Sequence, residues 1–122
     1  MGCTLRALKN KTETGKEFVT YWFWWNPLWD YICETCKYLL EVSQIRNRDK
    51  VVDEKQAKKI TRRLKYLIFI GKVREYERLL PYYVSGTDYA DYSFHEEKVK
   101  EFIEFAEQSG GFEITDGYIE KQ

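Results

Sequence analysis

The sequence predicts an α+β fold, a small antiparallel sheet of two or three strands packed against three or four helices. Three observations indicate this fold: a β-favouring aromatic run lies near the start, three segments of helical period follow it, and a short strand-like segment comes last. The chain of 122 residues is 43% hydrophobic and 17% aromatic, so it can bury one core and offset the entropy of folding. We therefore expect a single domain over residues 1–122.

The first element is a predicted hairpin over residues 3–25. Residues 17–25, Glu-Phe-Val-Thr-Tyr-Trp-Phe-Trp-Trp, favour a strand, and turn-forming residues such as Asn10 and Gly15 precede them. Strand alternation would send the large rings to opposite faces, with Tyr21, Phe23 and Trp25 on one and Trp22 and Trp24 on the other. Either both faces belong to a two-sided core, or one of them meets a partner or a ligand.

The first helix is predicted over residues 27–43. Asn26 can cap this helix, and Pro27 suits its first position because the amide hydrogen that proline lacks would be unpaired there. Apolar residues then recur at three- and four-residue steps and form one stripe, Leu28, Trp29, Ile32, Cys33, Cys36, Leu39 and Leu40. Residues 44–52 follow as a polar connection.

The second helical segment is predicted over residues 54–80. Asp53 and Gln56 have the spacing of a capping box at its start. Gly71 predicts a break, which leaves either one kinked helix or two short ones, and Pro81 is expected to end the segment.

The last helix is predicted over residues 94–108, after a tyrosine-rich loop at 82–92. Ser93 and Glu96 have capping-box spacing at its start. Two consecutive glycines end the helix, and residues 112–114 are predicted to form a short strand that could join the hairpin.

The formal net charge of zero hides an uneven distribution of charge along the chain. Residues 46–74 carry 11 basic and 3 acidic side chains, whereas residues 75–122 carry 4 basic and 12 acidic ones. The two segments therefore have net charges of +8 and −8. The basic helix would either attract anions or be compensated by the acidic last helix.

The CxxC sequence Cys33-Glu34-Thr35-Cys36 predicts core packing instead of a redox or zinc site. Both cysteines fall on the apolar stripe, and Cys33 lies too far from the helix start for the helix dipole to lower its pKa. Cys3 and the sole histidine, His95, are the other candidate ligands, so we expect no metal and no cofactor. No complete catalytic motif is present, and we predict a protein that is not an enzyme and has no catalytic residues.

Three segments carry a resemblance to a family: Trp24-Trp25-Asn26-Pro27-Leu28-Trp29-Asp30-Tyr31, Ser93-Phe94-His95-Glu96-Glu97-Lys98-Val99-Lys100-Glu101-Phe102, and Ser109-Gly110-Gly111-Phe112-Glu113-Ile114. The chain resembles a family of small bacterial and phage proteins with a Trp-rich strand, a Pro-Leu-Trp helix start and a C-terminal Gly-Gly-Phe-Glu-Ile motif. The resemblance implies a phage or prophage setting and a compact α+β domain. It implies no particular activity.

These observations predict a small binding protein that sequesters a nucleotide-like anionic molecule and thereby blocks the immune signalling of a bacterial host. The candidate ligand-binding residues are Trp22, Trp24, Tyr66, Tyr82 and Tyr83 for stacking on a base, and Lys59, Arg62 and Arg63 for binding phosphates. The alternative is a protein–protein interaction module, an inhibitor or adaptor whose exposed aromatic face docks on a host defence protein or on a second copy of the chain.

Other partners and locations are disfavoured. The acidic last third of the chain disfavours nucleic acid as a partner. No apolar segment approaches the length of a membrane span or a signal peptide, so the expected location is the cytoplasm, that of the bacterial host if a phage encodes the protein.

Overall fold

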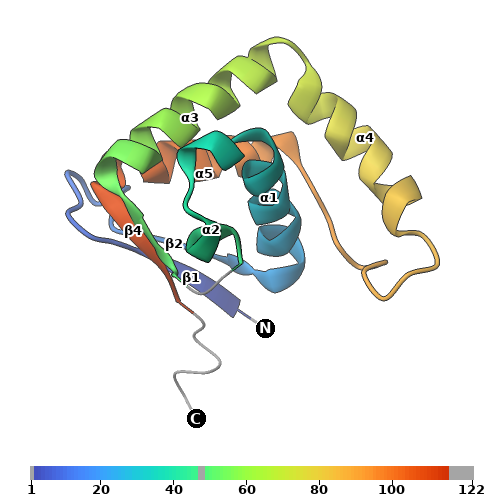
Figure 1. Ribbon diagram of the computed structural model, residues 1–122, viewed down its shortest axis with the longest axis horizontal. Coiled ribbons are helices and arrows are strands. Elements are labelled where there is room, and N and C mark those ends of the chain that lie inside the picture. Colours follow the sequence, from blue (N-terminus) through green and yellow to red (C-terminus); the bar gives the residue numbers. More distant parts are fainter. Residues whose placement is uncertain (1, 47–48, 116–122) are drawn as a thin grey trace.

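The structure, a computed structural model, describes residues 2–46 and 49–115, which form an α+β fold with one sheet and five α-helices (Figure 1). In chain order the elements are β1 (Gly2–Ala7), β2 (Glu17–Tyr21), α1 (Trp22–Thr35), the 3-10 turn η1 (Lys37–Leu39), α2 (Val42–Ile45), β3 (Val51–Asp53), α3 (Glu54–Phe69), α4 (Lys72–Val84), α5 (Glu96–Ser109) and β4 (Gly111–Thr115). The predicted α+β class is confirmed, but the structure has five α-helices where three or four were predicted. The sheet is larger than predicted, because it has four strands.

The four strands are all antiparallel and lie in the order β2-β1-β4-β3. The predicted hairpin is present as β1 and β2, and the predicted strand at 112–114 lies within β4. The additional strand, β3, begins at the end of residues 44–52, which were expected to be a polar connection, and continues to Asp53. The sequence prediction missed it because it has only three residues.

One face of the sheet is buried and the helices cover it. Its inward side chains follow strand alternation and come from all four strands: Cys3, Leu5, Phe18, Val52, Phe112 and Ile114. Phe102 of α5 lies against this face, with its ring centroid 6.1 Å from Phe18 and 5.6 Å from Phe112. The helix stripe and the sheet face thus form one core.

The strand predicted for residues 17–25 ends at Tyr21, and the assignment of Trp22 and Trp24 to one strand face is wrong. Residues 22–25 form the first turn of α1. As helical residues, Trp25 and Trp29 lie one turn apart and stack at 5.7 Å, and Trp25 also reaches Phe102 at 5.6 Å. Burial of these rings outweighs the modest strand preference of aromatic residues.

Pro27 lies inside α1 and not at its start. Its nitrogen has no hydrogen, so the carbonyl oxygen of Phe23, four residues earlier, lacks its normal helical donor. The amide of Ser93, from the loop after α4, donates to that oxygen at 2.8 Å. A tertiary hydrogen bond therefore replaces the missing helical one and ties the loop to α1.

The predicted helix over residues 27–43 is also too long, since α1 ends at Thr35. The Thr35 hydroxyl donates to the carbonyl of Tyr31 at 2.8 Å, and the chain then turns through η1 and α2. The carbonyl of Leu39 accepts instead from the Gln56 side chain at 3.0 Å. Bonds to α3 therefore stabilise the interruption.

The break at Gly71 is confirmed and separates α3 from α4. Gly71 has φ +82°, which favours glycine and turns the chain between the two helices, as Figure 1 shows. Pro81 does not end the segment, because α4 continues to Val84. Leu80 and Val84 are both buried at a spacing of four, so packing holds the last turn in place.

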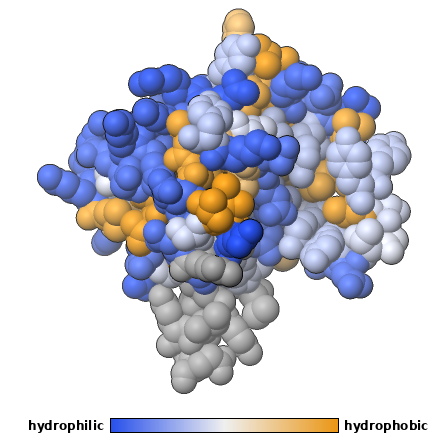
Figure 2. Space-filling view, viewed as in Figure 1, coloured by the Kyte–Doolittle hydropathy of each residue, from blue (hydrophilic) through white to orange (hydrophobic). Residues whose placement is uncertain are grey.

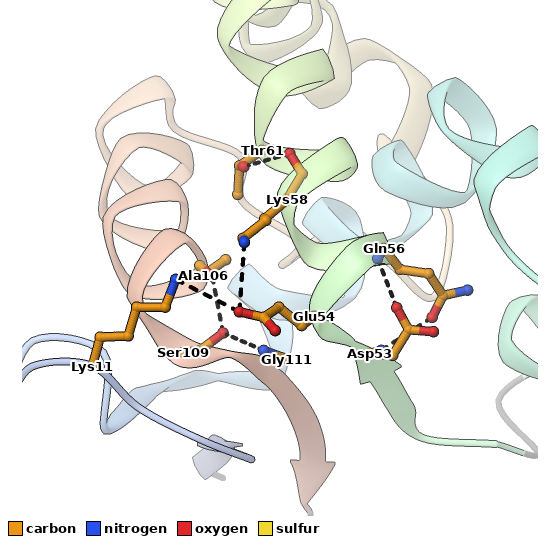
Figure 3. Close-up of polar contacts among 9 residues, drawn as sticks. All are labelled: Lys11, Asp53, Glu54, Gln56, Lys58, Thr61, Ala106, Ser109 and Gly111. Carbon is orange, nitrogen blue, oxygen red and sulfur yellow. Dashed lines mark hydrogen bonds and ion pairs between the residues drawn. The ribbon is translucent and has the colours of Figure 1, made fainter.

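The two predicted capping boxes have different outcomes. The Asp53 box is confirmed: Gln56 N donates to Asp53 Oδ1 at 2.7 Å, and Asp53 N donates to Gln56 Oε1 at 3.1 Å (Figure 3). The Ser93 box is wrong, because α5 begins after His95 and no side chain of that cap residue bonds the helix. The amide of Glu96 donates instead to the carboxylate of Glu77 on α4 at 2.6 Å.

The end of α5 and the start of β4 require glycine at Gly111. Its φ is +97°, and a Cβ there would lie 2.8 Å from Glu54 N and from Val52 O. Ser109 fixes the turn, since its hydroxyl donates to Ala106 O at 2.9 Å and accepts from Gly111 N at 3.1 Å (Figure 3). Within the described ranges, no helix has both the length and the apolar character needed to cross a bilayer.

Candidate functional site

Four of the eight predicted ligand-binding residues lie together on one face of α3. Lys59 and Tyr66 each lie three or four residues from both Arg62 and Arg63, so the four side chains project from one side of the helix. With two residues of η1, Tyr38 and Leu39, they line a groove of about 380 Å³. We call this the basic groove.

The basic groove offers two accessible aromatic rings beside its cations. Tyr38 is 70% exposed and Tyr66 is 51% exposed, so a large part of each side chain is accessible to solvent and to a stacking partner. The guanidinium carbon of Arg63 lies 5.5 Å from the centroid of the Tyr66 ring. This cation–π contact holds the arginine at the groove and leaves its hydrogen-bond donors available.

The basic residues of α3 divide into a compensated and an uncompensated set. Lys58 pairs with Glu54 at 3.6 Å, and Lys65 pairs with Glu107 of α5. Lys59, Arg62 and Arg63 have no carboxylate within 4.0 Å in the part of the chain that the structure describes. Carboxylates of α3 itself and of the acidic last helix therefore compensate one side of α3, and the groove side retains a net positive charge.

Arg63 has a further property that bears on binding. Its Nε atom is buried and donates to no acceptor among the described residues. Buried donors in proteins nearly always have a partner, so an oxygen atom of a ligand or a water at this place would supply the acceptor that Arg63 Nε lacks.

A pair of glutamine side chains positions the second wall of the basic groove. Gln44 and Gln56 exchange two amide hydrogen bonds, each at 2.9 Å, and Gln56 Nε2 also donates to Leu39 O at 3.0 Å. Gln44 Nε2 donates in addition to Val51 O at 2.7 Å. This pair fastens η1, and with it Tyr38, to the start of α3.

Sequence reasoning missed Tyr38, Leu39 and Gln44 because it placed all of them in or beside a continuous helix. Gln56 was identified only as part of the capping box. The signal available in the sequence was the presence of glutamines at positions 44 and 56. The sequence does not show that their side chains meet, because that contact depends on the fold.

The other predicted binding residues lie away from the basic groove. Trp22 lines a separate hollow of about 170 Å³ with Trp25 and Trp29. Trp24 lies beneath the ammonium group of Lys98, which is 4.4 Å from the ring centroid. Neither ring is among the residues that line the basic groove with the cations of α3.

The two tyrosines of α4 also differ in position. Tyr82 is 76% exposed and projects into solvent. Tyr83 lines a hollow of about 420 Å³ that shares Arg63 and Tyr66 with the basic groove, so it borders the predicted site without entering it.

The cysteines have the environment of core residues. Cys36 is fully buried, and Cys33 packs against the core. Burial, and then the charges of Asp30 and Cys36, raise the pKa of Cys33 to about 12, and burial also raises the pKa of Cys36. Both thiols are therefore protonated at neutral pH, whereas redox and metal chemistry use the thiolate. Among residues 2–46 and 49–115, no three His, Cys, Asp or Glu side chains gather in a way that could hold a metal ion.

No protein-family model, no curated protein and no solved structure matches this chain. The resemblance to the bacterial and phage family consequently stays a prediction from the three sequence segments. The chemistry of the site rests on its geometry, three uncompensated cations beside two accessible tyrosine rings.

Proposed function

We propose that the chain binds a nucleotide-like anionic small molecule in the basic groove and releases it unchanged. One observation carries this proposal: Lys59, Arg62 and Arg63 lie on one helix face without carboxylate partners and next to the rings of Tyr38 and Tyr66. Guanidinium groups match phosphate oxygens in geometry and charge, and a tyrosine ring can stack on a nucleobase.

The groove suits such a ligand in size and in its mixture of polar and aromatic walls. Its volume of about 380 Å³ falls within the range of small-molecule sites. In the phage or prophage setting that the resemblance implies, a protein of this kind would capture a host signal nucleotide and so block immune signalling.

Calorimetric titration with mono-, di- and cyclic nucleotides tests the proposal. We expect saturable binding of at least one of them, and the double variant K59Q/R62Q should weaken it by roughly a hundredfold or more, since each of the two lost hydrogen bonds from a charged group contributes about 1.5–3 kcal/mol. The matched control is K9Q/K16Q, which removes the same charge from exposed positions in the hairpin turn. Absence of binding to every nucleotide, or equal losses in both double variants, would contradict the proposal.

Mass spectrometry of the recovered ligand separates capture from turnover. An intact nucleotide after prolonged incubation agrees with sequestration. A converted product would show instead that the protein is an enzyme.

A second candidate function, a protein–protein interaction module, is favoured by the exposed corner between α3 and α4. Phe69 is 85% exposed and the adjacent Ile70 is 43% exposed, and Figure 2 shows apolar side chains at this corner, at the top of the view. Large apolar side chains this exposed are typical of contact surfaces. The candidate predicts self-association or partner binding that F69S abolishes without unfolding, as measured by light scattering and circular dichroism.

A further inference from the structure

A second hollow, beside α1, is lined by ten residues, and five of them are aromatic. It lies between α1, α4 and the loop after α4 and has a volume of about 520 Å³, larger than the basic groove. Its lining includes Trp29, Asp30, Tyr76, Tyr83, Tyr89 and Tyr92. We call it the aromatic pocket. It shares no lining residue with the basic groove.

Several contacts hold the walls of the aromatic pocket in place. Tyr92 accepts a hydrogen bond from the Asn26 side chain at 3.2 Å, and its ring lies 5.1 Å from that of Tyr89. On the α4 side, the ring of Tyr76 packs against Phe94 at 4.7 Å. The pocket is therefore shaped by the fold and does not depend on a ligand for its walls.

Asp30 is the one charged side chain among the described residues that line the aromatic pocket. It has no hydrogen bond or ion pair with any other described residue. Burial by neighbouring atoms raises the pKa of its carboxyl group, and after burial the charge of Asp30 helps to raise the pKa of Tyr76. An uncompensated and exposed carboxylate thus lies on the lining of the pocket, beside its tyrosines.

Tyrosine and tryptophan faces carry negative electrostatic potential, so they attract cations, and a carboxylate beside them adds to this attraction. Cages of aromatic rings recognise alkylated ammonium groups, and the five aromatic residues of the pocket offer such rings next to one acid. Anions would be repelled by Asp30. From this combination we infer that the aromatic pocket binds a small organic cation of the alkylammonium class, independently of the nucleotide-like ligand proposed for the basic groove.

Trp29 supplies a further contact for such a ligand. Its side chain is only 4% exposed, and its Nε1–H donates to no acceptor within the described part of the chain. Trp29 lines both the aromatic pocket and the small hollow beside Trp22, and a ligand hydroxyl that reaches Nε1 from the pocket would satisfy this donor. Choline, which carries both a quaternary ammonium and a hydroxyl, should therefore bind more tightly than tetramethylammonium.

The test is a calorimetric titration of the full chain with choline, tetramethylammonium and 3,3-dimethylbutan-1-ol, which is the uncharged carbon analogue of choline. We expect choline to bind saturably at millimolar concentrations or below, and the neutral alcohol to bind at least about tenfold more weakly, because it lacks the charge that the rings and the carboxylate attract. Equal binding of choline and the alcohol, or no saturable binding of choline, would overturn the inference.

Matched variants locate the binding site. D30N should weaken choline binding about tenfold or more, whereas D88N, which removes an exposed carboxylate outside the pocket lining, should leave it unchanged. Tyr83→Leu should weaken it severalfold, and Tyr82→Leu, at the neighbouring and more exposed position, should not. Tyr83 is 61% exposed, so its replacement tests the pocket even if D30N fails to fold. K59Q/R62Q should bind choline normally, and choline affinity unchanged in both D30N and Tyr83→Leu would refute the assignment.

Discussion

Replacing Gln44 with alanine should destabilise the whole protein, although Gln44 lies in a helix of only four residues. The side chain is 3% exposed and takes part in four hydrogen bonds, with Val51 O, with Glu41 N and twice with the Gln56 amide. Each such bond has a net worth of about 0.5–1.5 kcal/mol. Because water can replace part of the lost bonding near exposed Glu41, we expect a loss of about 3 kcal/mol in the free energy of unfolding.

Urea unfolding monitored by circular dichroism measures this change, which should also lower the Tm by roughly 10 °C. Gln108→Ala is the matched control, since Gln108 accepts a single side-chain bond, from Thr12 at 2.8 Å, and should lose about 1 kcal/mol or less. A double-mutant cycle between Gln44 and Gln56 should show coupling, because they share two bonds. If Gln44→Ala were no less stable than Gln108→Ala, the amide pair would not be what fastens η1 to α3.

Three further predictions concern other parts of the fold. Gly111→Ala should lose at least about 2 kcal/mol more than Gly86→Ala in urea unfolding, since both glycines have positive φ but only the first meets backbone atoms at the Cβ position. The pKa of Cys33 in the folded state, about 12, lies above its ordinary value of 9.0. The protonated thiol therefore makes its full contribution to the free energy of unfolding below pH 9.0, and this contribution is lost as the pH rises toward 12. Cys33→Ala should therefore unfold with a shallower alkaline loss of stability, and an unchanged slope would contradict this. Glu77→Ala removes the acceptor for the first amide of α5 and should lower the free energy of unfolding, measured by thermal unfolding, by about 1 kcal/mol. This loss should exceed that of an alanine substitution at any exposed glutamate without a backbone partner.

Local signals in the sequence predicted the elements that local physics controls. The Asp53 capping box, the break at Gly71 and the glycine-ended last helix need only neighbouring residues to form, and each is present in the structure. The α+β class followed from the same patterns. Four of the predicted ligand-binding residues, all on α3, lie together in the basic groove, because a single helix fixes their relative positions.

The errors lie where distant contacts decide the local structure. Residues 22–25 have strand propensity but become helical because Trp25 packs against α5. The helix that begins there ends at Thr35 because Gln56 bonds the η1 backbone. Trp22 and Trp24 were predicted as binding residues on the basis of the wrong strand geometry. The residues that line the basic groove opposite the cations are Tyr38 and Leu39, and they could be found only once the position of η1 was known.

The proline inside α1 has a consequence for the motions of the molecule. Since the Phe23 oxygen that Pro27 leaves without a donor is bonded to the Ser93 amide, the first turns of α1 and the loop beside the aromatic pocket are expected to open as one cooperative unit. In native-state hydrogen exchange the Ser93 amide should then exchange at the rate of α1 amides, more slowly than its neighbours in the loop. Substituting alanine for Pro27 would supply a competing helical donor, uncouple the two segments and let the loop exchange on its own.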